Sequence, residues 1–433
     1  MRDWSPEQVA DAAGGRLVAP APQAGGPQRA VIDSRAAGAG DLFVGLPGEN
    51  VDGGRFAAQA LAGGAWGVLV APGHAEAARC AMPGALIAAD DPLLALQRLA
   101  TAWRRALGCQ VVGITGSVGK TSTKDILAAM LAQAKRTVAN RENLNTEIGL
   151  PLTVLEAPPG TEALVVEMGM RGPGQIAELA AIAEPDVGVI TAVAPVHLEL
   201  MGSIEAIAAA KSELVAGLNP GGTAVIPAGE PLLEPHRRDD VTTVTFGPGG
   251  DVDALPDGLR LPFTSAHMRR NALAALAAAR AVGVEPVGAL EVALSSLRGQ
   301  RMHLPGDIVV VNDCYNANPM SMRAALDDLA ASEVIPPARR VAVLGDMLEL
   351  GPDEARFHAE IGAHARETGV DLLIAVGPRA AHFADGYGDV VALPDAQAAA
   401  ETVPGLLQPG DTVLLKASRG VGLEAVARAL ETA

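Results

Sequence analysis

The chain has 433 residues, of which 49% are hydrophobic, and its formal net charge is −17. This length suits roughly two to four domains, each with its own core. The acidic balance excludes a broad basic surface for nucleic acid or anionic membranes, but it remains compatible with a local pocket for a small anion.

The N-terminus and the cysteines indicate the compartment. The opening residues, MRDWSPEQVADAAGG, lack the apolar stretch of a secretory signal, and no run of about 18 apolar residues follows. We therefore expect a cytoplasmic protein without an integral membrane segment. Cys80, Cys109 and Cys314 stand far apart and are odd in number, which is not typical of a metal site or a disulfide framework. We expect small buried thiols.

The first region, residues 1–90, carries short apolar runs separated by Gly and Pro, among them WGVLVAP and ALIAAD. We assign it to a small mixed α/β domain. The next segment, DPLLALQRLATAWRRAL, has apolar residues at helical spacing and predicts a helix that leads into the second region.

Residues 91–300 alternate strand and helix patterns, with strands predicted at VVGIT, ALVVEMGM, VGVITAV, GTAVIPA and VTTVTF. Continuous apolar runs of this kind are typical of a parallel sheet covered on both faces. Residues 301–433 repeat the alternation in RRVAVLGDM, PDEARFHAEIGAHARETG, VDLLIAVG, DTVLLKAS and VGLEAVARAL. The predicted fold class is α/β, with a central parallel-sheet domain and a C-terminal, Rossmann-like, doubly wound domain. In such domains ligands bind beyond the carboxyl ends of the strands.

A glycine-rich segment after the first central strand carries the clearest chemical signal. The strand 111–115 runs into GSVGKTS at residues 116–122, and a helical pattern follows. This order predicts a P-loop, in which backbone N–H groups and Lys120 hold phosphates and the Thr121 hydroxyl can join a Mg²⁺ shell. The strict motif has Gly at the position of Ile114, and a tight turn without a ligand is the alternative. The strand–loop–helix context favours a nucleotide.

Two polar residues follow later central strands. Glu167 ends the apolar run ALVVE, so its carboxylate is expected at the tip of a buried strand, where Mg²⁺ and phosphates would bind. His197 comes after VGVITAV. Taken singly, a solvent-facing charge at Glu167 and an ordinary loop position for His197 are the alternatives.

Lys211 falls on the apolar face of a predicted helix over residues 203–218, together with Ile204, Ile207 and Leu214. Burying an ammonium group is costly unless the group is paired or chemically altered. A lysine that extends from the edge of the face to solvent is the alternative. The pattern nevertheless marks this lysine as unusual.

Taken together, GITGSVGKTSTK, EMGMRGPGQI, HLELMGSIEAIAAAKSEL, DCYNANP and LGDMLELG resemble the Mur ligase family. IDSRAAGAGDLFVGLPGENVDGGRF is similar to the N-terminal segment of the family and LLKASRGVGLE to its C-terminal one, so the resemblance covers nearly the whole chain. The YNANP run and LGDMLELG are most similar to members that add D-alanyl-D-alanine to UDP-N-acetylmuramoyl-tripeptide. The resemblance implies an ATP-dependent amide ligase of cytoplasmic peptidoglycan precursor synthesis that acts through an acyl phosphate.

Other functions remain as alternatives. Another amide ligase of the superfamily, such as the third-residue Mur ligase or a folylpolyglutamate synthase, is the nearest, and the YNANP run argues against both. A nucleotide-dependent switch would not need Glu167, His197 and an inward Lys211. A sugar-nucleotide binding module would leave the P-loop unexplained. The third residue of the peptide stays open between lysine, diaminopimelate and ornithine.

The resemblance also implies roles for single residues. The catalytic set is Lys120, Glu167, His197 and Lys211. ATP contacts are expected at Gly116, Ser117, Val118, Gly119, Lys120, Thr121, Ser122, Asn271, Arg301 and Asp313. The Mg²⁺ ligands would be Thr121, Glu167, His197 and Lys211, the last as a carbamate. The UDP-linked substrate would contact Ser34, Arg35, Asp52, Asn143, Asn145 and Thr146, and the dipeptide Tyr315, Asn316, Asn318 and Asp346.

The chain departs from the usual family pattern at three places. Residues 52–54 read Asp-Gly-Gly where Asp-Gly-His is usual, so a histidine contact is expected to be missing. Residues 194–196 read Ala-Pro-Val instead of a turn with glycine, and residues 312–314 read Asn-Asp-Cys instead of an aspartate pair and serine. We expect these changes to alter substrate contacts rather than the reaction.

We expect the protein to be a monomer with no nucleic-acid partner.

Overall fold

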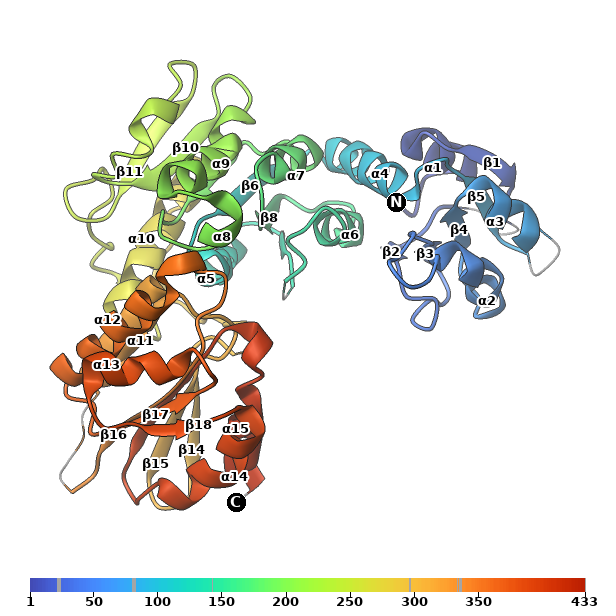
Figure 1. Cartoon of the computed structure of the whole chain (residues 1–433). Helices are drawn as coiled ribbons and strands as arrows, with labels where there is room; N and C mark the ends of the chain where they lie inside the picture. Colours follow the sequence, from blue (N-terminus) through green and yellow to red (C-terminus); the bar gives the residue numbers. More distant parts are fainter. Residues whose placement is uncertain are drawn as a thin grey trace.

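A computed structural model describes residues 1–21, 25–79, 83–141, 143–295, 297–332, 334 and 337–432. The chain forms three α/β units in sequence order, with the middle unit at the corner of an angular molecule (Figure 1). Cys109 and Cys314 are buried free thiols, as predicted, and Cys80 lies outside the described residues.

The N-terminal unit is a mixed five-stranded sheet. In spatial order its strands are β1 (Arg16–Ala19), β5 (Ala85–Ala88), β4 (Gly67–Val70), β3 (Asp41–Val44) and β2 (Arg29–Val31). Only β1 runs antiparallel to its neighbour. The helices are α1 (Pro6–Ala13), η1 (Gly53–Phe56), α2 (Ala57–Ala62) and α3 (Pro72–Ala78). The apolar runs WGVLVAP and ALIAAD contain β4 and β5, and the unit is small and mixed α/β, as expected.

The middle unit is a six-stranded sheet in which every pair is parallel. Its spatial order is β11 (Thr242–Phe246), β10 (Thr223–Pro227), β9 (Val187–Ile190), β6 (Gln110–Thr115), β8 (Ala163–Glu167) and β7 (Thr137–Ala139). One face packs on α5 (Lys120–Ala132) and α10 (Ala266–Ala281), and the other on α6 (Gly149–Glu156), α7 (Gln175–Ala183) and α9 (Ile204–Ala216). The prediction of a parallel sheet covered on both faces is confirmed. Outside the sheet are α8 (Leu198–Met201), η2 (Glu234–His236), β12 (Leu259–Arg260) and β13 (Gly288–Ala289).

The C-terminal unit is a six-stranded, doubly wound sheet, as predicted. Its order is β14 (Gln300–Leu304), β15 (Ile308–Asn312), β19 (Thr412–Lys416), β16 (Arg340–Gly345), β17 (Leu372–Val376) and β18 (Val391–Leu393), and only the β14–β15 pair is antiparallel. One face packs on α11 (Pro319–Ala330), α12 (Glu354–Glu367) and α13 (Phe383–Tyr387), and the other on α14 (Ala396–Leu406) and α15 (Glu424–Thr432). The remaining short turns are η3 (Gly351–Asp353), η4 (Ala380–His382) and η5 (Arg419–Val421).

Helix α4 (Pro92–Leu107) joins the first two units and matches the predicted helix. It begins where the Asp91 carboxylate accepts the N–H of Leu94 at 3.0 Å, and it ends at Gly108, whose φ of 61° is left-handed. The indole N–H of Trp103 donates to the Ala157 carbonyl at 3.0 Å, and its ring meets Trp4 edge-on at 5.4 Å. Helix α4 therefore shares one apolar core with α1 and with the middle unit.

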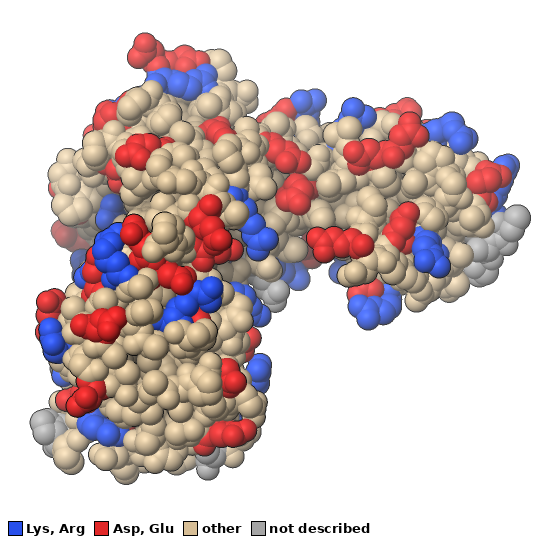
Figure 2. Space-filling model, in the orientation of Figure 1, with Lys and Arg blue, Asp and Glu red and all other residues tan. Residues whose placement is uncertain are grey.

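The surface shows no single large basic patch on the face drawn in Figure 2, where Lys and Arg are scattered among Asp and Glu. Within the described part of the chain, none of the helices combines the length and the apolar character that a membrane crossing requires.

We predict that Trp103→Ala lowers the free energy of unfolding by about 3–5 kcal/mol, because it removes a buried ring and leaves a cavity between two units. The denaturant midpoint of the purified protein measures the effect. Leu94→Ala, in the same helix but 40% exposed, is the matched control and should change stability little. Equal midpoints for both variants would contradict the role given to α4.

Candidate active site

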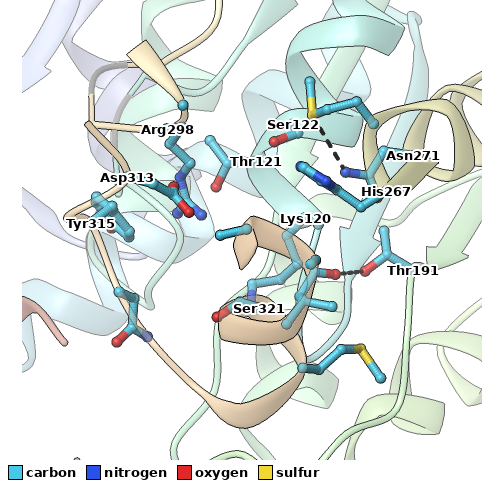
Figure 3. Close-up of a pocket in the computed structure, with 18 of the residues that line it drawn as sticks. Lys120, Thr121, Ser122, Thr191, His267, Asn271, Arg298, Asp313, Tyr315 and Ser321 are labelled. Atoms are coloured by element: carbon cyan, nitrogen blue, oxygen red, sulfur yellow. Dashed lines mark hydrogen bonds between the residues drawn. The ribbon is translucent and has the colours of Figure 1, made fainter. Parts of the chain in front are cut away.

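A cavity of about 1950 Å³ lies between the middle and C-terminal units. Its wall combines the P-loop and α10 of the middle unit with β15 and α11 of the C-terminal unit (Figure 3). Most of the predicted site residues line it: Ser117, Val118, Gly119, Lys120, Thr121, Ser122, Asn143, Asn145, Thr146, Glu167, His197, Asn271, Arg301, Asp313, Tyr315, Asn316 and Asn318.

The P-loop connects β6 to the first residue of α5, as predicted. Ile114 is fully buried and pairs with Glu167 of β8, so position 114 belongs to the strand and the turn begins at Gly116. Gly119 has a φ of 82°, and a Cβ there would lie 2.4 Å from the side-chain oxygen of Asn271. The ammonium of Lys120 donates to the Gly116 carbonyl at 2.7 Å. Only glycine at position 119 lets the loop lie this close to α10.

Glu167 lies at the carboxyl end of β8 and is buried. Its two carboxylate oxygens accept hydrogen bonds from the Thr121 hydroxyl at 2.7 Å and from the Asn145 amide at 2.8 Å. The solvent-facing alternative for this residue is therefore wrong. The arrangement places a carboxylate, a hydroxyl and the P-loop at one edge of the sheet.

Two residues that carried no sequence prediction hold Glu167 in place. The side-chain oxygen of Asn140 accepts the backbone N–H of Glu167 at 2.8 Å. The buried Lys124 donates to the carbonyl of Asn140 at 2.7 Å and pairs with Asp125 at 2.9 Å. A lysine one turn beyond the P-loop could have been suspected, but nothing in the spacing shows which loop it reaches.

Lys211 is buried in α9, whose first turn is capped by Ser203 through the N–H of Ala206 at 3.1 Å. Burial lowers the pKa of Lys211 well below its ordinary value, and the nearby charge of Lys120 lowers it further. Its ammonium has no carboxylate partner among the described residues. The edge-of-face alternative for this lysine is wrong, and burial disfavours its charged form.

His197 follows β9 of the middle sheet and has a left-handed φ of 54°. Its Nδ1 pairs with the carboxylate of Glu349 from the C-terminal unit, although the imidazole also lines the cavity. Burial lowers the pKa of His197, an effect that Glu349 opposes and Lys120 and Lys211 reinforce. Nowhere in the described ranges do three or more His, Cys, Asp or Glu side chains converge on one metal position.

The C-terminal wall of the cavity is built on hydrogen bonds that the sequence did not reveal. Asp313 pairs with the buried Lys416, whose ammonium also donates to the Asn316 carbonyl at 3.0 Å. The guanidinium of Arg298 lies 3.9 Å from the ring centre of Tyr315 and faces the cavity (Figure 3). Lys416 lies in the LLKASRGVGLE segment, but nothing in that segment shows that it pairs with Asp313, and Arg298 belongs to none of the quoted motifs.

The side chains of Asn318 and Asp346 accept hydrogen bonds from backbone N–H groups of the C-terminal unit. Asn318 caps α11 by accepting the N–H of Ser321 at 2.9 Å, and it lines the cavity as well. Asp346, at the end of β16, is buried and accepts the N–H of Ala380 at 2.7 Å, with Arg379 at 3.8 Å.

Three predicted substrate contacts lie in the N-terminal unit, apart from this cavity. Arg35 is exposed and pairs with Asp33 at 2.7 Å, and the Ser34 hydroxyl lies 3.5 Å from the side chain of Gln59. Asp52 accepts the N–H of Gly54 at 2.9 Å and meets His74 at 2.8 Å. All three follow the carboxyl ends of parallel strands.

Fold and site define a three-domain α/β protein with a P-loop at the cleft between two of its sheets. Family models for the Mur ligase family catalytic domain, middle domain and glutamate ligase domain match residues 30–105, 114–257 and 297–419. The chain belongs to the Mur ligase family.

Named proteins are similar to this chain in sequence and in structure. The chain is 39% identical to UDP-N-acetylmuramoyl-tripeptide–D-alanyl-D-alanine ligase of Synechocystis sp., over 91% of this chain and 90% of the relative. It is also similar to the crystal structure of MurF from Acinetobacter baumannii, with a TM-score of 0.86, 29% identity and 99% of each chain covered. MurF ligase from Thermotoga maritima, solved in complex with ADP, superposes with a TM-score of 0.79 and 29% identity over 93% of this chain and 97% of that one.

Gly119→Ala is predicted to weaken ADP binding at least about tenfold, because the new methyl group collides with Asn271 and displaces the loop. Gly221→Ala is the matched control: Gly221 has the same φ of 82°, but a Cβ there meets nothing within 4 Å. Titration calorimetry with ADP measures both variants. If the control loses as much affinity as Gly119→Ala, general destabilisation of the protein rather than the contact with Asn271 accounts for the loss.

Proposed function

We propose that this protein is an ATP-dependent ligase that joins D-alanyl-D-alanine to UDP-N-acetylmuramoyl-tripeptide in peptidoglycan precursor synthesis. The observation that carries the proposal is the convergence of Lys120, Thr121 and Glu167 at one edge of the cavity, opposite the YNANP segment of the C-terminal unit. The names of the relatives support the same reaction and do not favour the third-residue or folate ligases.

The reaction begins with attack of the peptide carboxylate on the γ-phosphorus of ATP, which forms an acyl phosphate and releases ADP. The amine of the dipeptide then attacks the acyl carbon, loses a proton, and phosphate leaves. Two anions must meet in the first step, so positive groups have to offset their repulsion. Lys120 and the backbone N–H groups of residues 116–122 supply them. Burial lowers the pKa of Lys120, and the nearby charge of Glu167 partly offsets this lowering.

We further propose a Mg²⁺ site formed by Thr121, Glu167, His197 and a modified Lys211. The buried carboxylate and hydroxyl fit the oxygen donors that Mg²⁺ prefers. When bound, the ion would neutralise developing charge on the phosphates. His197 would have to exchange its contact with Glu349 to take part.

The modification proposed for Lys211 is a carbamate. A neutral amine attacks CO₂, an N–C bond forms, one proton is lost, and the side chain becomes anionic. Burial lowers the pKa of Lys211, which shifts the side chain toward the neutral amine that this step needs. An ammonium at Lys211 repels the ammonium of Lys120. A negative carbamate would replace this repulsion with attraction.

The three units are proposed to divide the substrates between them. Residues 1–90 would hold the UDP end through Ser34, Arg35 and Asp52, and residues 91–300 would hold ATP and the peptide arm. Residues 301–433 would close on ATP and hold the dipeptide, with Asn271, Arg301 and Asp313 on the nucleotide. A monomer and a cytoplasmic location stay predictions.

The reaction itself can be tested by mixing the purified protein with ATP, Mg²⁺, D-alanyl-D-alanine and UDP-N-acetylmuramoyl-tripeptide. We expect phosphate release and a UDP-pentapeptide only when all substrates are present, with mass spectrometry as the readout. The three possible third residues of the tripeptide form separate arms. Phosphate release that ignores both peptides would instead indicate a plain ATPase.

Lys211→Ala is predicted to lose most ligase activity, about a hundredfold or more, because a ligand of the metal site disappears. A short added carboxylate should restore part of it. With ¹³C-bicarbonate, wild-type protein should show a carbamate carbon resonance that the variant lacks. Lys135→Ala, which removes a lysine bonded to Gln110 outside the cavity, is the control. Near-normal activity of Lys211→Ala would remove the carbamate from the mechanism.

A further inference from the structure

The imidazole of His74 lies directly against the backbone of Gly54 in the N-terminal unit. His74 belongs to α3, which follows β4, and Gly54 belongs to η1, which follows β3. A Cβ on Gly54 would lie 2.3 Å from Cδ2 of His74 and 2.8 Å from its Cγ. Contacts this short with a rigid ring cannot be relieved by a small shift, so a side chain at position 54 and the present ring position exclude each other.

Asp52 fixes the orientation of this ring. One oxygen of its carboxylate accepts the Gly54 N–H at 2.9 Å, and the other meets Nε2 of His74 at 2.8 Å. The hydrogen bond with His74 is the main reason that the pKa of Asp52 lies below its ordinary value. Both carboxylate oxygens are therefore engaged by the protein itself. Nδ1 of the ring is the remaining polar atom of His74, and it can meet a ligand beside the carboxylate of Asp52.

The pair also lies where a ligand of this sheet would bind. Ser34, Asp52 and His74 follow the carboxyl ends of the neighbouring parallel strands β2, β3 and β4. Ligands of parallel α/β sheets bind at this edge. The side chain of His74 remains 28% exposed, so the ring is accessible while its position is fixed.

We propose that His74 is a binding residue for the nucleotide part of the UDP-linked substrate, held in place by Asp52. The proposal rests on the proposed function for the identity of the ligand. It reverses the expectation that a histidine contact is missing because residue 54 is glycine. The imidazole comes instead from α3, twenty positions later in the chain, and Gly54 is the space that admits it.

Titration of UDP into the wild-type protein and into His74→Ala tests the proposal without any ligation step. We expect UDP to bind about tenfold more weakly to the variant, as for the loss of one hydrogen bond. In the ligase assay the KM for the UDP-tripeptide should rise by a similar factor, while kcat and the KM for ATP stay within about twofold. His236→Ala, a half-buried histidine of the middle unit, is the control and should change neither quantity.

A second pair of variants tests the shared space. Gly54→His alone should weaken UDP binding and lower the melting temperature, because two rings then compete for one position. Gly54→His combined with His74→Gly should regain UDP affinity to within about threefold of wild type. If the double variant has the wild-type melting temperature but regains no UDP affinity, a histidine at position 54 cannot replace His74, and this part of the proposal is overturned.

The outcomes separate this proposal from the proposed function. Equal UDP affinity of wild type and His74→Ala overturns the role of His74, whatever the ligase assay shows. A lowered melting temperature with unchanged UDP affinity also overturns it, since the ring would then be structural only. If UDP binding depends on His74 but the wild-type protein joins no dipeptide, the binding role of His74 stands and the proposed ligase reaction is refuted.

Discussion

The register between β6 and β8 is the constraint on which the site depends. Ile114 pairs with Glu167, so the P-loop leaves the sheet beside the strand end that carries the carboxylate. Thr121, at the start of α5, can then donate to that carboxylate at 2.7 Å. A shift by one residue would turn Glu167 to the opposite face of the sheet and bury it against apolar side chains.

Lysine ammonium groups beside the P-loop are the second feature of the site. Burial lowers the pKa of both Lys120 and Lys211. The charge of Lys120 lowers the pKa of Lys211 further, whereas Glu167 raises the pKa of Lys120. Such a region is unfavourable by itself and becomes favourable when phosphates enter. A local positive site of this kind is compatible with the net charge of −17.

Contacts between units determine which residues of the site face each other. His197 reaches across to Glu349, and Arg298 stacks on Tyr315 at 3.9 Å. In the N-terminal unit Asp52 and His74 meet although 22 positions separate them in the chain. These pairs join loops at the ends of different strands, where a fold can vary its ligands while the sheets stay fixed.

The sequence by itself determined the three α/β units, the central parallel strands, the P-loop and the inward position of Lys211, because each follows from local periodicity or from a short motif. It missed β14, whose residues are mostly exposed, and β7 and β18, which have three residues each. Only the tertiary structure decided that Asn140 and Lys124 support Glu167, that Lys416 pairs with Asp313, and that His74 fills the space above Gly54. These contacts join segments far apart in the chain, and no local pattern of residues encodes the distance between them.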